Sequence, residues 1–205
     1  MTGFRLDKGG LIERRQKINF RFNGQQVTGF KGDTIASALM ASGHMLVGRS
    51  FKYHRPRGIM SAGVEEGGAL FNTGDGAARV PNVKGTVTEI TEGLRVYSQN
   101  VFPSPGFDLG AVNGLIAPFI TAGFYYKTFM GPFANTKFWM LCERFIRRAA
   151  GLGEASREAD PSTYDIANGF CDALVIGSGP AGLTAAAGLA EKGLNVILVE
   201  QDFEC

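Results

Sequence analysis

Cys171-Asp-Ala-Leu-Val-Ile-Gly-Ser-Gly-Pro-Ala-Gly-Leu183, with the residues that follow it to Glu200, is the stretch that decides the fold of this sequence. It begins with an apolar segment, Asp172 to Ile176, which runs directly into the glycine pattern G-x-G-x-x-G. The Ala- and Leu-rich residues from Leu183 to Lys192 predict a helix, and Leu194 to Glu200 is a second apolar segment that ends on an acid. Strand, glycine turn, helix and strand in this order predict the first βαβ unit of a Rossmann-type dinucleotide-binding domain.

The residues of the glycine turn have distinct predicted roles. Gly177 would permit the tight turn off the strand, Gly179 would let the backbone approach a pyrophosphate, and Gly182 would let the helix pack against the sheet. The helix N-terminus offers free N–H groups to phosphate, and Glu200, 18 residues after Gly182, is placed to bind an adenosine ribose. The predicted cofactor-binding residues are Gly177, Ser178, Gly179, Pro180, Ala181, Gly182, Glu200 and Gln201.

Two questions stay open at this turn. The same pattern occurs in glycine-rich turns of other α/β proteins, and by itself it does not distinguish NAD from FAD. Only five residues follow Glu200, whereas a doubly wound sheet needs several more strands. We therefore expect the front part of a longer polypeptide, with an incomplete dinucleotide-binding domain that is inactive by itself.

Composition and charge are those of an ordinary globular protein. The 205 residues are 44% hydrophobic and 20% charged, and the net charge of +2 gives no general case for nucleic-acid binding. The three cysteines lack disulfide-framework spacing and the first twenty residues lack an apolar signal-peptide core, so we expect a cytoplasmic protein. The apolar stretch Leu109–Tyr126 is interrupted by glycines and Pro118, and we interpret it as a buried or interfacial loop and not as a membrane span.

The first hundred residues predict a small α+β domain. Apolar and polar residues alternate in Lys17–Phe22, and Asn23-Gly24 is typical of a hairpin turn. Asp33 or Thr34 is expected to cap a helix that continues through Ser42. The expected strands are Lys17–Phe22, Gln26–Phe30, His44–Val47, Ala69–Asn72 and Thr86–Ile90. Two strands, a crossing helix and further strands indicate a β-grasp module.

Gly48-Arg-Ser-Phe-Lys-Tyr-His-Arg-Pro-Arg-Gly58 has the most unusual local composition. Its basic residues alternate with aromatic ones and no acid lies among them. A solvated basic loop is one interpretation, and RNA binding is another, because aromatic side chains stack on bases and arginine pairs with phosphate. The segment is short and the chain nearly neutral, so we expect no nucleic-acid partner. We favour a basic loop, Arg49–Arg57, that docks on an acidic partner surface or a cofactor phosphate.

A series of short motifs runs in order along nearly the whole chain. The motifs are Gly32-Asp-Thr-Ile-Ala-Ser-Ala-Leu39, the Gly48–Gly58 segment, Val64-Glu-Glu66, Ser98-Gln-Asn100, Ala122-Gly-Phe-Tyr-Tyr-Lys-Thr-Phe-Met130, Ala150-Gly-Leu-Gly153 and the stretch from Cys171 to Glu200. With this combination the chain resembles the amino-terminal region of the alpha subunits of heterotetrameric sarcosine oxidases.

The resemblance implies a subunit of a flavin-dependent amine oxidoreductase. Such an enzyme oxidises sarcosine to glycine with O2, and it gives H2O2 and a one-carbon unit passed to tetrahydrofolate. The resemblance further implies NAD in this subunit, FAD and FMN in the complex, and beta, gamma and delta subunits as partners. The folate-binding region of such a subunit would lie in its carboxyl half, outside this sequence.

The ferredoxin-like relatives of this module carry a 2Fe–2S cluster, whose plant-type ligand spacing is C-x4-C-x2-C with a fourth cysteine further on. Placed after the Arg-Pro-Arg-Gly element, the first three positions fall on Ser61, Glu66 and Ala69. These side chains cannot replace three soft thiolates. We therefore expect no iron–sulfur cluster and a module kept for structure or assembly.

The expected fold class is α+β followed by α/β. Residues 1–100 would form a β-grasp, ferredoxin-like domain without cluster cysteines. Residues 101–165 would be an aromatic and glycine-rich connecting segment with an amphipathic helix at Phe138–Ala150 and a polar linker at Gly151–Tyr164. Residues 166–205 would be the truncated start of an FAD/NAD-type Rossmann domain.

Two further functional hypotheses stay open. The parent protein could be the alpha subunit of a related FAD-dependent amino-acid or opine dehydrogenase, although the missing cluster ligands weigh against this. It could also be a non-catalytic assembly module, although the complete βαβ pattern weighs against that. The sequence assigns no catalytic residue and no metal ligand, and we interpret His44 and His54 as structural or surface residues.

Overall fold

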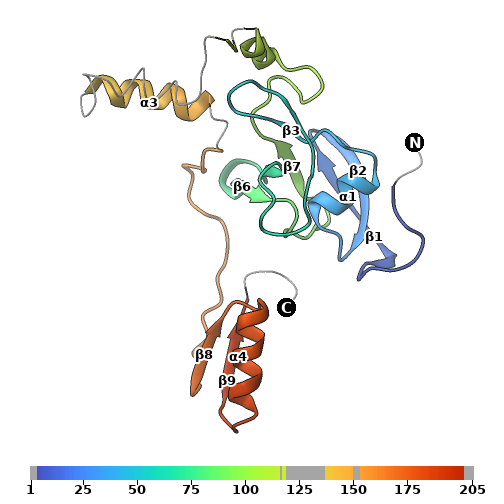
Figure 1. The fold of residues 1–205 in the computed structure, drawn as a ribbon, viewed down its shortest axis with the longest axis vertical. Coiled ribbons are helices and arrows are strands. Elements are labelled where there is room, and N and C mark those ends of the chain that lie inside the picture. The colour runs from blue at the N-terminus through green and yellow to red at the C-terminus, as the bar shows by residue number, and fades with distance from the viewer. Residues whose placement is uncertain (1–3, 116, 119–136, 150–152, 201–205) are drawn as a thin grey trace. The chain divides into compact units, whose positions relative to one another are not determined.

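The computed structural model describes residues 4–115, 117–118, 137–149 and 153–200 (Figure 1). The chain divides into two compact units, Met1–Asp160 and Pro161–Cys205. Among the described residues, no helix is both long enough and apolar enough to cross a membrane.

The first unit is built on a mixed five-stranded sheet. Its strands are β1 (Glu13–Phe22), β2 (Gln25–Lys31), β5 (Leu70–Thr73), β6 (Val80–Lys84) and β7 (Arg95–Ser98). Their order across the sheet is β2-β1-β7-β5-β6, and β1 and β7 form the parallel pair while the other pairs are antiparallel. A second, two-stranded pair joins β3 (Gly48–Arg49) to β4 (Pro56–Arg57).

Local sequence signals account for the first hairpin and the helix. Asn23 and Gly24 both have positive φ, 48° and 83°, as a tight turn between twisted strands requires. Helix α1 (Ile35–Ala41) begins after Thr34, whose side chain accepts a hydrogen bond from the Ser37 amide in a capping box. The predicted hairpin and helix are confirmed, and Thr34 is the cap. Asp33 is instead buried below the helix start.

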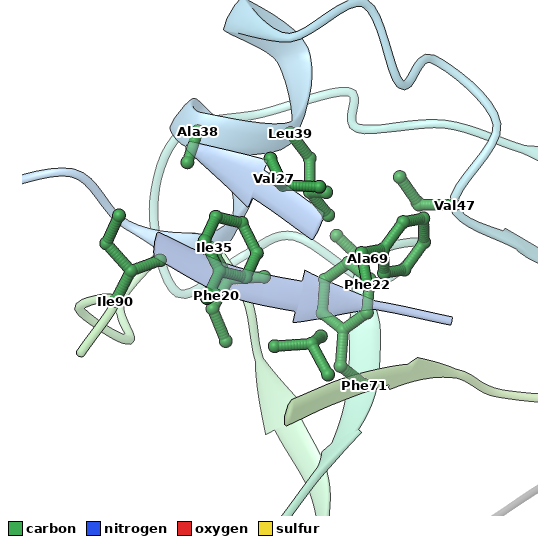
Figure 2. Packing of buried hydrophobic residues seen from close by; sticks show 11 residues of the cluster. Phe20, Phe22, Val27, Ile35, Ala38, Leu39, Val47, Ala69, Phe71 and Ile90 are labelled. Carbon is green, nitrogen blue, oxygen red and sulfur yellow. The ribbon is translucent and has the colours of Figure 1, made fainter. Parts of the chain in front are cut away.

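The core of this unit lies between α1 and the sheet, as Figure 2 shows. The buried hydrophobic residues of this cluster are Phe20, Phe22, Val27, Ile35, Ala38, Leu39, Val47, Ala69, Phe71, Ile90 and Val96. The rings of Phe22 and Phe71 meet edge to face with centroids 6.0 Å apart. Each large side chain removed from water contributes roughly 1.5–3 kcal/mol, so burial of this cluster stabilises the unit.

Two predicted strands are wrong. His44–Val47 contains no strand, because the backbone pairs one step later, at Gly48–Arg49, where β4 lies opposite. Thr86–Ile90 is a turn with one isolated bridge, because its backbone forms hydrogen bonds with the start of α1 and not with a strand. The amides of Ile35 and Ala36 donate to the carbonyls of Thr88 and Gly85, which satisfies two donors at the start of α1. The sheet instead contains β6 and β7, which lie outside the predicted strands.

The connecting region is described only in part. A 3-10 helix, η1, spans Gly76–Ala78, and a second, η2, spans Leu109–Gly114. No residue of η2 is buried. The described start of the Leu109–Tyr126 stretch is therefore not a buried loop, which is one of the two predicted alternatives. The rest of this stretch, from residue 119, lies outside the described residues. Helix α3 (Lys137–Ala149) begins one residue before the predicted helix, and residue 150 lies outside the described residues.

The second unit is a βαβ unit. Strand β8 (Ala173–Ile176) is followed by α4 (Pro180–Ala190) and by β9 (Val196–Val199), which is parallel to β8. The predicted strand–helix–strand order is confirmed. The helix begins three residues earlier than expected because Pro180 occupies its first turn, where a missing N–H costs nothing. Residues 153–172 before it contain no helix or strand.

Candidate functional site

The turn between β8 and α4 is closed by backbone contacts. Gly177 has φ +96°, a conformation that favours glycine, and its amide donates to the Val199 carbonyl at 2.7 Å. The chain thereby leaves the strand at the carboxyl ends of two parallel strands. Ligands of open α/β sheets bind at this edge.

The other two glycines of the pattern differ in what surrounds them. A Cβ on Gly182 would overlap the Gly177 carbonyl and lie 3.5 Å from the Val175 side chain. A Cβ on Gly179 would meet nothing within 4 Å. Gly182 is thus needed for the close approach of α4 to the turn, whereas Gly179 leaves open space at the helix start.

The N-terminus of α4 is available for an anion. Gly179 is the N-cap and supplies no side-chain acceptor, and Pro180 stands in the first turn beside Ala181. The N–H groups of this first turn have no partner within the helix, and the helix dipole is positive at this end. This arrangement fits a phosphate group better than any neutral ligand.

The acid at the end of β9 lies against the same turn. The Glu200 Oε2 atom accepts a hydrogen bond from the Ser178 amide at 2.5 Å. The predicted site residues Gly177, Ser178, Gly179, Gly182 and Glu200 are therefore brought together, while Gln201 lies outside the described residues. Their role in binding a nucleotide stays a prediction.

The residues at the three positions where cluster cysteines would stand, Ser61, Glu66 and Ala69, do not fit an iron–sulfur cluster. Ala69 is 1% exposed and belongs to the hydrophobic core. Glu66 is only 4% exposed, and its carboxylate already accepts hydrogen bonds from loop amides. Ser61 donates through its hydroxyl to Glu66 at 3.4 Å. Among the described residues there is also no group of three His, Cys, Asp or Glu side chains that could hold a metal ion.

Glu66 has an acceptor role that the sequence did not reveal. Its Oε2 atom accepts from the amides of Met60 at 2.6 Å and Ser61 at 2.7 Å, and its Oε1 atom accepts from the amide of Gly68 at 2.5 Å. Burial opposes the charged form, yet these backbone hydrogen bonds outweigh it and lower the pKa of Glu66. The side chain is therefore held as a buried carboxylate.

The basic loop Arg49–Arg57 uses part of its charge internally. The Arg49 guanidinium donates to the carbonyl of Pro105 at 2.7 and 2.9 Å and to the carbonyl of His54 at 2.9 Å. Arg55 and Lys52 each lie 4.9 Å from the Tyr53 ring centroid. Arg55 and Arg57 are exposed, so they are the cations of this loop best placed to meet a partner.

His54 is a structural residue of the loop. Its Nδ1 atom lies 2.6 Å from the Oδ2 atom of Asp108, whose side chain is fully buried. Asp108 also accepts from the amides of Phe102 and Gly110 through Oδ1. The sequence interpretation of His54 as structural agrees with this contact, but Asp108 was missed because no local pattern links residues so far apart.

Comparisons with known proteins match both parts of the chain. Residues 15–101 match the family described as a 2Fe-2S iron-sulfur cluster binding domain, and residues 172–205 match an FAD binding domain. A solved structure of L-proline dehydrogenase from P. horikoshii is 15% identical to this chain, with a TM-score of 0.41. The alignment covers 91% of this chain and 25% of that one.

Two curated relatives cover nearly the whole chain. Sarcosine oxidase subunit alpha from Rhizobium meliloti (strain 1021) is 54% identical over 202 residues, which are 98% of this chain and 20% of the relative. Sarcosine oxidase subunit alpha from Corynebacterium sp. (strain U-96) is 31% identical over 94% of this chain and 15% of the relative. The chain thus spans about a fifth or less of the length of these relatives. The chain is similar to the N-terminal part of sarcosine oxidase alpha subunits.

Proposed function

We propose that the protein is the alpha subunit of a heterotetrameric sarcosine oxidase. The complex would oxidise sarcosine to glycine with O2, giving H2O2 and a one-carbon unit for tetrahydrofolate, together with beta, gamma and delta subunits and in the cytoplasm. The observation that supports this most directly is the 54% identity along 98% of the chain. The described part of the protein would contribute binding and assembly surfaces.

The glycine turn would hold the diphosphate of a dinucleotide. The open space at Gly179 and the uncapped start of α4 would accept the pyrophosphate, and Glu200 would accept hydrogen bonds from the ribose. We propose NAD as the occupant, with FAD and FMN elsewhere in the complex. FAD is the second candidate at this turn, because the matching family is described as an FAD binding domain. Either molecule would supply two-electron redox chemistry when bound.

Thermal melts of the complete subunit with NAD and with FAD would test this assignment. A ligand present at a hundred times its dissociation constant stabilises a competent site by roughly 2.7 kcal/mol. Gly179→Val places a branched side chain where the pyrophosphate must approach, so it should abolish the shift without unfolding the sheet. Glu200→Ala should weaken binding by about 1–3 kcal/mol. Gly188→Ala is the control, because a Cβ there meets nothing within 4 Å.

The outcomes separate the candidates. A shift with NAD that Gly179→Val removes supports the proposal. A shift with FAD alone assigns the turn to the flavin, and a shift with neither dinucleotide contradicts a nucleotide site in this turn.

The domain organisation follows from the same proposal. Residues 1–100 would be a β-grasp domain of ferredoxin type without a cluster, residues 101–165 a connecting segment, and residues 166–205 the start of the Rossmann-type domain. The strand order and the parallel β1–β7 pair support the first assignment. Anaerobic purification of the complete subunit followed by assays for iron and acid-labile sulfide should find neither in stoichiometric amount. Stoichiometric iron with a charge-transfer band would contradict the proposal that this domain lacks a cluster.

A further inference from the structure

The loop from Met60 to Gly68 is folded around a single buried carboxylate. Two amides at the start of the loop, those of Met60 and Ser61, donate to one oxygen of Glu66 at 2.6 and 2.7 Å. The amide at its end, that of Gly68, donates to the other oxygen at 2.5 Å. The carboxylate therefore joins the two ends of the loop from its interior.

No cation in the described part of the chain forms an ion pair with Glu66. The nearby Lys84 ammonium donates instead to the Val64 carbonyl at 2.7 Å. The charge of Glu66 is thus balanced by backbone N–H dipoles, as in anion-binding loops of the kind that hold phosphates and iron–sulfur clusters. Hydrogen bonds to a charged acceptor are about twice as strong as neutral ones, which explains how a buried carboxylate is tolerated without a counter-ion.

The position of this carboxylate is the second part of the argument. Glu66 stands at the second of the three positions at which a plant-type cluster would have cysteines, within residues 15–101 that match a 2Fe-2S cluster binding domain. In a cluster-bearing loop, sulfur atoms would accept the converging amide N–H groups. Here the three positions are Ser61, Glu66 and Ala69, so the thiolates are absent, and the amides of residues 60, 61 and 68 converge on Glu66 instead.

We propose that the Glu66 carboxylate takes the structural place of an iron–sulfur cluster, as a built-in anion that orders the loop Met60–Gly68. The loop is fixed to the sheet region by two further hydrogen bonds, from the Thr86 hydroxyl to the Gly63 carbonyl at 2.8 Å and from Lys84 to Val64. Those two bonds connect the loop to residues outside it, whereas the Glu66 carboxylate connects residues within the loop. Without the anion, three amide donors would face one another with no acceptor.

Hydrogen–deuterium exchange of the complete subunit in its complex tests this proposal. Glu66→Gly empties the anion site, and the amides of residues 60, 61 and 68 should then exchange at least roughly tenfold faster than in the unchanged protein. Sodium formate supplies a small carboxylate of the same chemistry, and it should restore slow exchange in this variant while sodium chloride at equal ionic strength does not. Glu65→Gln is the matched control, because Glu65 is the exposed neighbour of Glu66 and accepts a hydrogen bond from the amide of Gly63 at 3.3 Å.

Glu66→Gln keeps the shape and removes the charge, and it serves if the glycine variant does not fold. Its amide group turns a donor toward at least one of the loop amides, so exchange should be faster than in the Glu65→Gln control. Exchange in Glu66→Gln as slow as in the unchanged protein would overturn the proposal, because the charge would then be unnecessary. Failure of formate to slow exchange in a folded Glu66→Gly protein would overturn it as well.

Discussion

The imidazole Nδ1 atom of His54 lies 2.6 Å from the Oδ2 atom of Asp108, and a hydrogen bond between them ties the basic loop Arg49–Arg57 to the segment that begins η2. The histidine side chain is 13% exposed and the aspartate side chain is fully buried. Arg49 makes a parallel connection to the Pro105 carbonyl. The basic loop is therefore held at its first residue, Arg49, and again at His54.

Gly110→Ala should release this connection. A Cβ on Gly110 would overlap the His54 ring, so the ring must leave Asp108 and a buried acceptor loses its partner. We expect faster hydrogen exchange in residues 48–57 of the complete subunit. Gly106→Ala is the control, because a Cβ there meets nothing within 4 Å. Equal exchange in the two variants would show that the His54 contact does not order the loop.

Reversing the charge of Arg55 and Arg57 should weaken assembly or cofactor retention. Both side chains are exposed, and an acidic partner surface or a phosphate would meet repulsion from two glutamates. The measurement is co-purification of the subunits and bound cofactor with Arg55→Glu/Arg57→Glu. Lys17→Glu/Lys31→Glu carries the same charge change on exposed positions of the β1–β2 hairpin. If both double variants assemble normally, the loop is an ordinary solvated surface.

Gly182→Ala should destabilise the βαβ unit while Gly188→Ala should not. The two glycines lie in the same helix, but only the first would place a Cβ against the Gly177 carbonyl. We expect a loss of about 1–3 kcal/mol from overpacking at Gly182 and a gain of roughly 0.5–1 kcal/mol at Gly188 from the helix preference of alanine. Chemical denaturation of the complete subunit gives both values. Similar stability of both variants would contradict the close packing of α4 on the turn.

Asp33→Ala should be strongly destabilising. The carboxylate is fully buried and accepts hydrogen bonds from Nη1 and Nη2 of Arg5 at 3.0 and 2.6 Å. It also accepts from the Phe30 amide at 2.8 Å and from the Ser37 hydroxyl at 2.7 Å. Removing one partner of a fully buried pair costs on the order of 3–5 kcal/mol, and the loss here should be smaller because the Arg5 side chain is 21% exposed. Asp75→Ala is the comparison, because its contacts with Arg95 and Tyr97 are exposed and such pairs contribute little. Denaturant midpoints should therefore separate the two, and a similar small loss in both would contradict a structural role for Asp33.

The loop Met60–Gly68 should stay ordered at a pH below the ordinary pKa of a glutamate. The backbone hydrogen bonds lower the pKa of Glu66 in the folded protein against the opposing effect of burial. A lowered folded-state pKa means that the stabilisation is fully present above the unfolded-state value and is lost as the pH falls through the folded-state value. The acid that neighbours it, Glu65, also has a lowered pKa but is exposed. Exchange rates of the Ser61 and Gly68 amides, corrected for intrinsic pH dependence and measured beside a Glu66→Gln variant, would show this window.

Much of the backbone could be predicted because its causes are local. The alternation in Lys17–Phe22, the positive φ of Asn23-Gly24 and the capping residue Thr34 act within a few positions of one another. The glycine pattern from Gly177 to Gly182 likewise encodes its own turn, since one glycine adopts positive φ and another makes room for the helix. These features follow from steric limits and hydrogen bonds between near neighbours.

Contacts between distant residues were decided only by the tertiary structure. Thr86–Ile90 has the composition of a strand, but the Thr88 carbonyl accepts a hydrogen bond from the Ile35 amide at the start of α1. Strand β7 instead lies in the sheet, between β1 and β5. The sequence showed that Glu66 is not a cysteine, but it did not show that three amides converge on that carboxylate. Which buried donor finds which acceptor depends on the chain's path through space, because every such group must be satisfied once water is excluded.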